Sequence, residues 1–353
     1  MVQFGSRSVG DGAPCFVTYE AGPTHDGVES AKKLVRMAAE AGADAVKFQI
    51  LDPDRLVADR KQLFSYQVLV DKETGQLEDV SEPLYDILCR RALNKDEWRE
   101  IKKACDALDL AFFATAGFED EVNFLAELGC HSIKIASADV DHFPLIKQAA
   151  ATGMCLQLDT GNATIGEIEE AIDIIRQTGN EDIIIHHCPS GYPARLESIN
   201  LNVIPTLKRM FPYPVAYSDH TPGWEMDVAA IAMGANLVEK TITEDRTTRS
   251  VEHVFSLEPP EMRRFIEVLR EVEIAMGRSR RVMHEEEKEK RKLVRRSICV
   301  SNDVAAGTVL TEADLTYRRP GLGISPKELD RVVGTRLAGD KKAGEALAWT
   351  DLS

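Results

Sequence analysis

Short apolar runs and helix-like segments alternate along the first two thirds of the chain. Eight runs are rich in β-branched, aromatic or other apolar residues, at positions 15–20, 45–50, 111–115, 132–137, 155–159, 183–187, 215–219 and 237–241. Segments between them, such as 29–41, 95–108, 119–128, 165–177 and 226–233, place apolar residues every three or four positions, as amphipathic helices do. The pattern therefore predicts repeated strand–helix units.

Strands that are joined by crossover helices run parallel and are buried on both faces, which explains why these runs are almost continuously apolar. Eight units within about 240 residues match the size of a closed barrel. The alternative is a doubly wound open sheet, which usually has fewer strands and a glycine-rich first turn, whereas the first turn here reads EAGPTHDG at 20–27. We predict an α/β fold with a (β/α)8 TIM barrel.

Two segments interrupt this regularity. The stretch 51–82 is too long for an ordinary strand–helix loop, so we expect a lid, an interface arm or a plain insertion. The run HEEEKEKRKLVRR at 284–296 has little apolar content, which is typical of a solvated helix or linker. We predict a barrel domain at 1–283, a charged linker at 284–296 and a small β-rich domain at 297–353, with strand-like runs at 297–300 and 347–350.

Composition narrows the class of protein. The 353 residues include 43 Lys and Arg against 58 Asp and Glu, which gives a net charge of −15 and disfavours nucleic acid or an anionic membrane as a partner. No run of about 18 apolar residues occurs, and the first residues lack the layout of a secretion signal. The seven cysteines are scattered without a CxxC pair. We expect a cytoplasmic protein with reduced cysteines.

Polar residues stand at the carboxyl ends of nearly all the predicted strands, where barrel enzymes place their chemistry. Lys47, Lys134 and Lys240 lie within apolar runs, and a buried ammonium group is costly without an anionic partner. The three lysines either pair with nearby carboxylates or converge to hold a polyanion, and we favour the second interpretation. His186 and His187 must point to opposite faces of one strand, which makes His220 the better candidate for a metal ligand.

Several motifs together resemble the N-acetylneuraminate (sialic acid) synthase family. They are AKKLVRMAAEAGADAVKFQ at 31–49, SIKIASADVDHFPLI at 132–146, HCPSGYP at 187–193, SDHTPG at 218–223, and RRS at 295–297 followed by RPGLGI at 319–324. That family joins a (β/α)8 barrel to an antifreeze-like SAF domain. The resemblance implies a transferase that condenses phosphoenolpyruvate (PEP) with an N-acetylhexosamine-type aldehyde. The expected products are phosphate and a nine-carbon 2-keto-3-deoxy sugar acid, as in sialic acid biosynthesis.

The resemblance also assigns roles to residues. The expected PEP-binding residues are Lys47, Thr115, Lys134, Ser137 and Ser218, and the expected sugar contacts are Asp139, Tyr192 and Arg319. Arg319 would reach the partner subunit's site in a domain-swapped homodimer. The expected catalytic residues are Glu20, Lys47, Lys134, Asp139 and His220.

The family uses a divalent metal, Mn²⁺ or Mg²⁺, to polarise the aldehyde, and His220 occupies a metal-ligand position. The sequence departs from the family at Thr241, which replaces the second ligand histidine, and at Asp159, which replaces a serine. Asp159 or Glu239 is therefore expected to supply the second ligand. Because further departures lie in the segments expected around the sugar, a different acceptor is plausible.

Two other functions remain open from the sequence. Loss of the second metal-ligand histidine fits a barrel that has lost catalysis and binds a sugar phosphate. Buried lysines also fit an aldolase that forms a Schiff base through Lys134 or Lys240.

Overall fold

The computed structural model describes residues 1–353 and divides them into two compact units, Met1–Gly277 and Arg278–Ser353. Each unit has its own hydrophobic core and is described by itself. The division falls six residues before the predicted end of the barrel domain at residue 283. None of the helices combines the length and the apolar composition that would let it cross a membrane.

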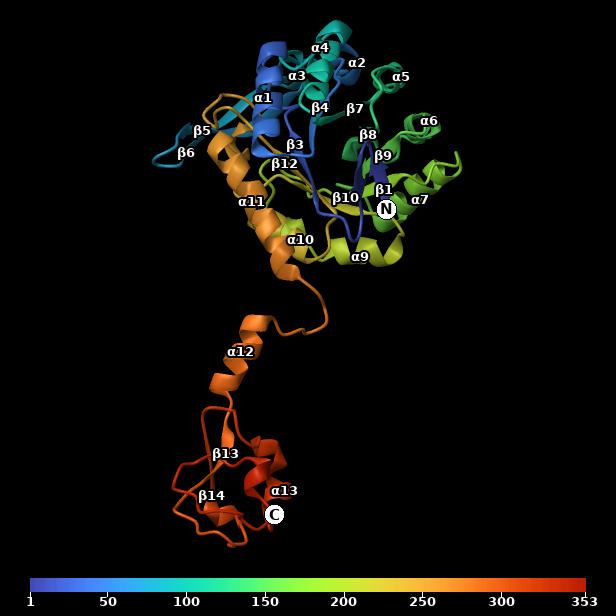
Figure 1. The fold of residues 1–353 in the computed structure, drawn as a ribbon. Helices are drawn as coiled ribbons and strands as arrows, with labels where there is room; N and C mark the ends of the chain where they lie inside the picture. Colours follow the sequence, from blue (N-terminus) through green and yellow to red (C-terminus); the bar gives the residue numbers. More distant parts are fainter. The chain divides into compact units, whose positions relative to one another are not determined.

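The first unit is a closed barrel of eight parallel strands (Figure 1). In chain order the strands are β3 (Phe16–Glu20), β4 (Ala45–Gln49), β7 (Ala111–Thr115), β8 (Ser132–Ile135), β9 (Cys155–Asp159), β10 (Ile183–His187), β11 (Val215–Asp219) and β12 (Leu237–Thr241). β12 pairs with β3 and completes the ring. The closed ring confirms the predicted barrel, and the open-sheet alternative is wrong.

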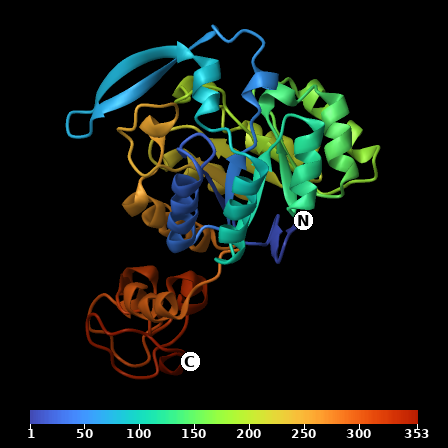
Figure 2. The ribbon, with the colours of Figure 1, turned by 90° about the horizontal axis from the view of Figure 1, so that it is seen from above.

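Helices surround the strands (Figures 1 and 2). The longer ones are α1 (Val28–Ala41), α4 (Lys95–Asp106), α5 (Glu119–Glu127), α6 (Phe143–Ala151), α7 (Ile165–Arg176), α9 (Val203–Met210), α10 (Glu225–Ala232) and α11 (Pro259–Met276), and the short ones are α2 (Pro53–Leu56), α3 (Leu84–Cys89) and α8 (Leu196–Ile199). Sequence signals set their ends: Asn94 caps α4 with a capping box, and Gly42 ends α1 at a φ of 92°.

The amino-terminal end of the barrel is sealed by an apolar plug that the sequence pattern did not predict. Nearly every strand contributes one of its first three residues to a single apolar cluster, which includes Phe16 and Phe113. A hairpin of β1 (Val2–Phe4) and β2 (Arg7–Val9) inserts Phe4 into it, with ring centroids 4.9 Å from Phe16 and 5.4 Å from Phe113. Any polar site inside the barrel must therefore open at the other end.

The long segment after β4 forms an antiparallel hairpin of β5 (Leu63–Asp71) and β6 (Gln76–Pro83), which extends outward from the barrel (Figures 1 and 2). Its base is anchored, because Tyr66, Val68 and Val80 form a small apolar cluster with Ile87 of α3, against which Val251 packs. Residues farther along the hairpin, such as Leu77, are exposed.

The second unit begins with the helix α12 (Glu285–Val294), which occupies the predicted charged linker and has no buried residue. A two-stranded sheet follows, made of β13 (Ser297–Val300) and β14 (Leu315–Arg318), with a short helix α13 (Leu329–Val332). The strand predicted at 347–350 is wrong, because residues Trp349–Asp351 form a 3-10 turn. Leu347 contributes its side chain to the core, donates a backbone hydrogen bond to Ile298 and accepts one from Ile324, but the turn that follows ends the extended segment.

Candidate active site

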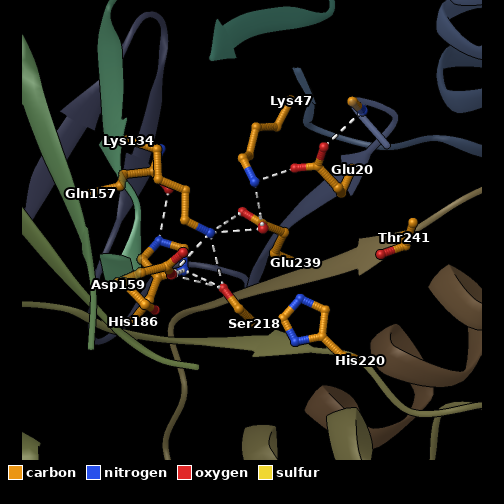
Figure 3. Close-up of polar contacts among 12 residues, drawn as sticks. Glu20, Lys47, Lys134, Gln157, Asp159, His186, Ser218, His220, Glu239 and Thr241 are labelled. Carbon is orange, nitrogen blue, oxygen red and sulfur yellow. Dashed lines mark hydrogen bonds and ion pairs between the residues drawn. The ribbon is translucent and has the colours of Figure 1, made fainter. Parts of the chain in front are cut away.

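The carboxyl-terminal half of the barrel interior is lined by polar side chains. Alternation along each strand points every second residue inward, two residues above the apolar plug. The inward residues brought together in this way include Glu20, Lys47, Lys134, Gln157, Asp159, His186, Ser218 and Glu239 (Figure 3). The barrel register therefore gathers residues that lie up to about 220 positions apart in the chain.

Five of these residues form a chain of buried ion pairs, which we call the charge cluster: Glu20, Lys47, Lys134, Asp159 and Glu239 (Figure 3). Glu239 accepts from both lysines, at 3.1 Å from Lys47 and 2.7 Å from Lys134. Lys47 also pairs with Glu20, and Lys134 lies 3.0 Å from Asp159. In the protein without ligand, Lys47 and Lys134 are therefore paired with nearby carboxylates, which is the first of the two interpretations offered for the buried lysines.

The cluster holds three carboxylates against two ammonium groups, and this imbalance sets its pKa shifts. Burial acts to raise the pKa of Glu239, but the charges of Lys134 and Lys47 outweigh it and hold that pKa well below the usual range. Burial raises the pKa of Glu20, which Lys47 only partly offsets. The pKa of Lys47 stays well above normal, because Glu20 and Glu239 outweigh its burial. Glu20 is thus the member of the cluster best suited to carry a proton.

Ser218 connects the charge cluster to a neutral network. Its Oγ accepts from Lys134 at 3.0 Å and lies 2.8 Å from Nδ1 of His186. His186 Nε2 contacts the amide oxygen of Gln157 at 2.8 Å, and the pKa of His186 lies well below normal because of burial and the charge of Lys134. A neutral imidazole that donates from Nε2 to Gln157 leaves Nδ1 to accept from Ser218. Sequence reasoning did not select Gln157, although its place in a buried strand was a usable signal.

Lys240 does not belong to this interior, which corrects the prediction that three lysines converge. Glu239 points into the barrel, so the next residue must point outward, where Lys240 pairs with Asp219 and lies 3.5 Å from Asp227. Lys240 also donates to the carbonyl of Thr221 at 2.6 Å. It therefore braces the turn after β11 from outside, and the alternative of a Schiff base on Lys240 at the rim is wrong.

His220 and Thr241 lie beside the charge cluster (Figure 3). Nδ1 of His220 lies 3.3 Å from the carbonyl of Pro189, to which a neutral imidazole donates, and burial lowers the pKa of His220. Its Nε2 is thus a potential ligand. Thr241 Oγ1 donates to Glu252 at 3.4 Å.

The remaining donors do not complete a metal site. Asp159 and Glu239, the expected second ligands, are both ion-paired to Lys134. No three His, Cys, Asp or Glu side chains come together as a ligand set for a metal ion. Because His220 is the one candidate ligand not tied to a lysine, the residues present do not fit a metal held by the protein alone. Use of Mn²⁺ or Mg²⁺ stays a prediction.

Ser137 and Thr115 lie at the carboxyl ends of two barrel strands. Ser137 follows β8 in a 3-10 turn (Ser137–Asp139), and its Oγ accepts from the amide of Gly161 at 3.0 Å. A Cβ on Gly161 would lie 2.7 Å from both that oxygen and the carbonyl of Cys188, so only glycine permits this approach. Thr115 is paired in register with Lys134. Both hydroxyls thus lie on strand ends of the polar half of the barrel.

The expected sugar contacts have less defined surroundings. Asp139 is half-buried, its pKa is raised by burial, and the imidazole of His142 lies 3.7 Å away. Tyr192 is 47% exposed, with its ring centroid 4.7 Å from that of His220, so it lies at the rim. Arg319 is exposed in the second unit. The roles of these three residues stay predictions.

Comparison with known proteins agrees with this architecture. A family model described as the NeuB family matches residues 34–281, and a SAF domain model matches residues 295–353. Together the two matches span most of both units.

Relatives with different named products resemble the chain along nearly its whole length. The N,N'-diacetyllegionaminic acid synthase of Legionella pneumophila is 33% identical over 98% of this chain and 96% of its own. The pseudaminic acid synthase of Helicobacter pylori is 29% identical over 91% of this chain and 93% of its own. The solved structure of the N-acetylneuraminic acid (sialic acid) synthetase from Leptospira borgpetersenii superposes with a TM-score of 0.71 at 28% identity, and it covers 82% of this chain and 94% of its own.

Proposed function

Because the chain belongs to the NeuB family, and is accordingly a synthase that forms carbon–carbon bonds, we propose that it condenses PEP with an N-acetylhexosamine-type aldehyde and releases phosphate. The product is a nine-carbon 2-keto-3-deoxy sugar acid. The observation that carries the proposal is the placement of two buried ammonium groups, Lys47 and Lys134, around one carboxylate of the sealed barrel. With Glu20 protonated, the two lysines balance the two remaining carboxylates, and a small polyanion can replace those carboxylates as the partner of the lysines.

Binding of PEP would exchange ionic partners. Without ligand, Lys134 donates to Glu239, Asp159 and Ser218, so its ammonium group is already satisfied. A phosphate or carboxylate group that enters the site supplies the same acceptor oxygens with more charge, and charge-assisted hydrogen bonds are the stronger kind. Ser218, Ser137 and Thr115 would add neutral donors. The lysines thereby orient PEP with its C3 toward the rim.

The chemical step requires proton transfers at the same place. The π electrons of PEP form the bond from C3 to the aldehyde carbon, and the aldehyde oxygen takes up a proton. Water then adds to C2 and loses one proton. The bond between C2 and the phosphate oxygen breaks, and the remaining hydroxyl proton passes to the leaving phosphate, which leaves the ketone. Glu20, with its pKa raised by burial and its amide contact to Gly22 at 2.7 Å, is our assignment for the group that accepts and returns a proton.

Phosphate release from PEP tests the proposal directly. We expect release only when PEP and an aldose are both present, with an N-acetylhexosamine preferred over the parent hexose. We also expect EDTA treatment to remove the activity and Mn²⁺ or Mg²⁺ to restore it. Full activity after EDTA treatment would contradict the metal prediction alone. Binding of PEP without turnover on any aldose would instead favour the sugar-phosphate-binding alternative.

A homodimer with exchanged SAF domains is part of the proposal, and charge supports it. Residues 278–353 carry 16 basic and 12 acidic side chains, whereas residues 1–277 carry 27 basic and 46 acidic ones. The small unit is therefore at +4 and the barrel unit at −19. Opposite net charge favours association of a small unit with a barrel.

A further inference from the structure

We propose that a cavity beside the barrel rim binds an N-acyl substituent of the acceptor sugar and selects acceptors by the size of that group. This inference rests on the proposed function. We call the cavity the hairpin pocket, because the base of the hairpin β5–β6 forms one wall. It is lined by Pro23, Gln49, Leu51, Phe64, Tyr66, Gln67, Leu84, Ile87, Leu88, Arg91, Tyr192, Val251 and Glu252.

The hairpin pocket has the size of a small organic group. Its volume is about 170 Å³, and an engineered apolar cavity of about 150 Å³ binds benzene. Most of the wall is apolar, with Phe64 from the hairpin and Leu84 and Leu88 from α3 only partly buried. Apolar side chains that remain partly exposed around a cavity gain free energy when a ligand covers them.

The inner end of the hairpin pocket adjoins the charge cluster. Gln49 lies in its wall, and its amide Nε2 is 3.5 Å from Oε1 of Glu20. Glu252 lies in the same wall and accepts from Thr241, the last residue of β12. A molecule that fills the pocket is therefore within one side chain of the reacting centre. This continuity fits a substituent of the second substrate better than a separate ligand.

The polar groups of the wall specify the kind of substituent. Arg91 is committed, since its guanidinium donates to the carbonyl of Pro23 at 2.7 Å and to Ser250 at 2.8 Å. Gln67 donates to Asp79 at 3.1 Å. Glu252 has an acceptor oxygen to spare, and the Gln49 amide has a donor. An amide group complements that pair, because its N–H suits Glu252 and its carbonyl suits Gln49, with the alkyl end against the leucines.

Substitutions at Leu84 test this inference by size. Leu84→Trp fills the pocket, and we expect the preference in kcat/KM for an N-acetylhexosamine over the parent hexose to fall at least about tenfold. Leu84→Ala enlarges the pocket and should shift preference toward N-butanoyl over N-acetyl acceptors. Leu88→Trp is a second filling variant. Leu77→Trp is the control, since Leu77 is a leucine of the hairpin that forms one wall of the pocket, is 46% exposed and does not itself line the cavity.

The outcomes separate this inference from the proposed function. A preference that is the same in wild type and in all three variants overturns the hairpin pocket while phosphate release still supports the reaction. An equal loss on acylated and parent acceptors also overturns it, because a purely structural defect acts on both. If no aldose supports phosphate release, the proposed function fails. In that case calorimetry tests the hairpin pocket by itself, with N-acetyl and N-butanoyl hexosamines titrated into wild type and Leu84→Trp. Equal affinity of the two proteins for these sugars, or no binding to wild type, would overturn the hairpin pocket.

Discussion

At the scale of single residues, the site is governed by which carboxylate each lysine holds. Glu239 is shared by Lys47 and Lys134, so neither lysine can change partner without changing the charge that the other one faces. Glu252 is different, because no lysine or arginine lies within ion-pair distance, and burial raises its pKa to about 8. Glu252 therefore differs from the carboxylates of the charge cluster in having no cationic partner, and the loss of hydration on burial favours its protonated form.

Replacement of Lys134 should abolish PEP binding. Lys134→Met leaves Asp159 and Glu239 without their shared cation, so we expect at least a hundredfold weaker PEP binding by calorimetry and a loss of stability of about 3–5 kcal/mol. Lys240→Met is the matched control, since it breaks a buried ion pair on the outside of the barrel. It should lose comparable stability and keep its PEP affinity. Equal PEP affinity in both variants would argue against the anion site.

Glu252 should make stability depend on pH in a definite direction. The unfolded pKa of a glutamate is about 4.3, whereas that of folded Glu252 is about 8. Between these values the folded protein binds a proton that the unfolded chain does not, so this contribution to stability is lost as pH rises through about 8. Glu252→Gln removes it. Urea unfolding at pH 5 and pH 8 should show the variant gaining stability relative to wild type at pH 8, and parallel curves would refute this.

At the scale of elements, the alternation of side chains along each strand decides which residues face the barrel interior and which face outward. Glu239 and Lys240 are neighbours in β12, yet one belongs to the site and the other braces the turn that carries His220. The same rule separates His186, which joins the inner network, from His187, which bonds the carbonyl of Ile199 outside. The hairpin β1–β2 acts differently: it fills the amino-terminal end of the barrel, so the polar interior opens only at the carboxyl-terminal end.

The plug should stabilise the barrel without taking part in chemistry. Phe4→Ala removes a ring that is 1% exposed and packs between Phe16 and Phe113, so we expect a loss of about 3–5 kcal/mol in chemical denaturation. Kinetic constants at low temperature should match wild type. Gln3→Ala, at an exposed position of the same strand, is the control and should change stability by less than about 0.5 kcal/mol. A large change in the KM for PEP would show that the plug also shapes the site.

At the scale of the whole molecule, the net charge of −15 is the sum of two unlike units. The barrel unit carries all of the excess acid, while its polar interior concentrates two lysines and the small C-terminal unit is basic. An acidic exterior repels unrelated polyanions, so anion binding is confined to places where buried cations overcome it. This distribution is consistent with one small anionic substrate.

Domain exchange predicts that two inactive variants restore each other. Lys134→Met inactivates the barrel, and Arg319→Ala is expected to remove the sugar contact from the SAF domain. A co-expressed mixture should recover about a quarter of wild-type phosphate release, because random pairing makes half the dimers mixed and each holds one intact site. Arg331→Ala, another exposed arginine of that unit, is the control and should retain activity alone. No recovery would contradict the exchange.

Much of the fold follows from local patterns, whereas the partners within the site do not. The eight strands were predictable because burial on both faces leaves a continuous apolar run, and the family resemblance followed from motifs in their order. The β5–β6 hairpin was not predictable, since its pattern alternates irregularly, and neither was the plug, whose three-residue strands are too short for periodicity. Lys240 was predicted to face the site, because the sequence of a fully buried strand does not show which residues face the barrel interior until one of them has been placed.

The sequence by itself determined that a (β/α)8 barrel carries lysines, carboxylates and histidines at its strand ends, because periodicity and burial are local properties. Only the tertiary structure decided that Glu239 joins two lysines, that Lys240 turns away, and that Gln49 and Glu252 meet beside a cavity. These pairings depend on barrel closure and register, which bring together residues far apart in the chain. The ion pairs of the site and the size of the adjoining cavity therefore depend on contacts between distant segments, which no single segment determines.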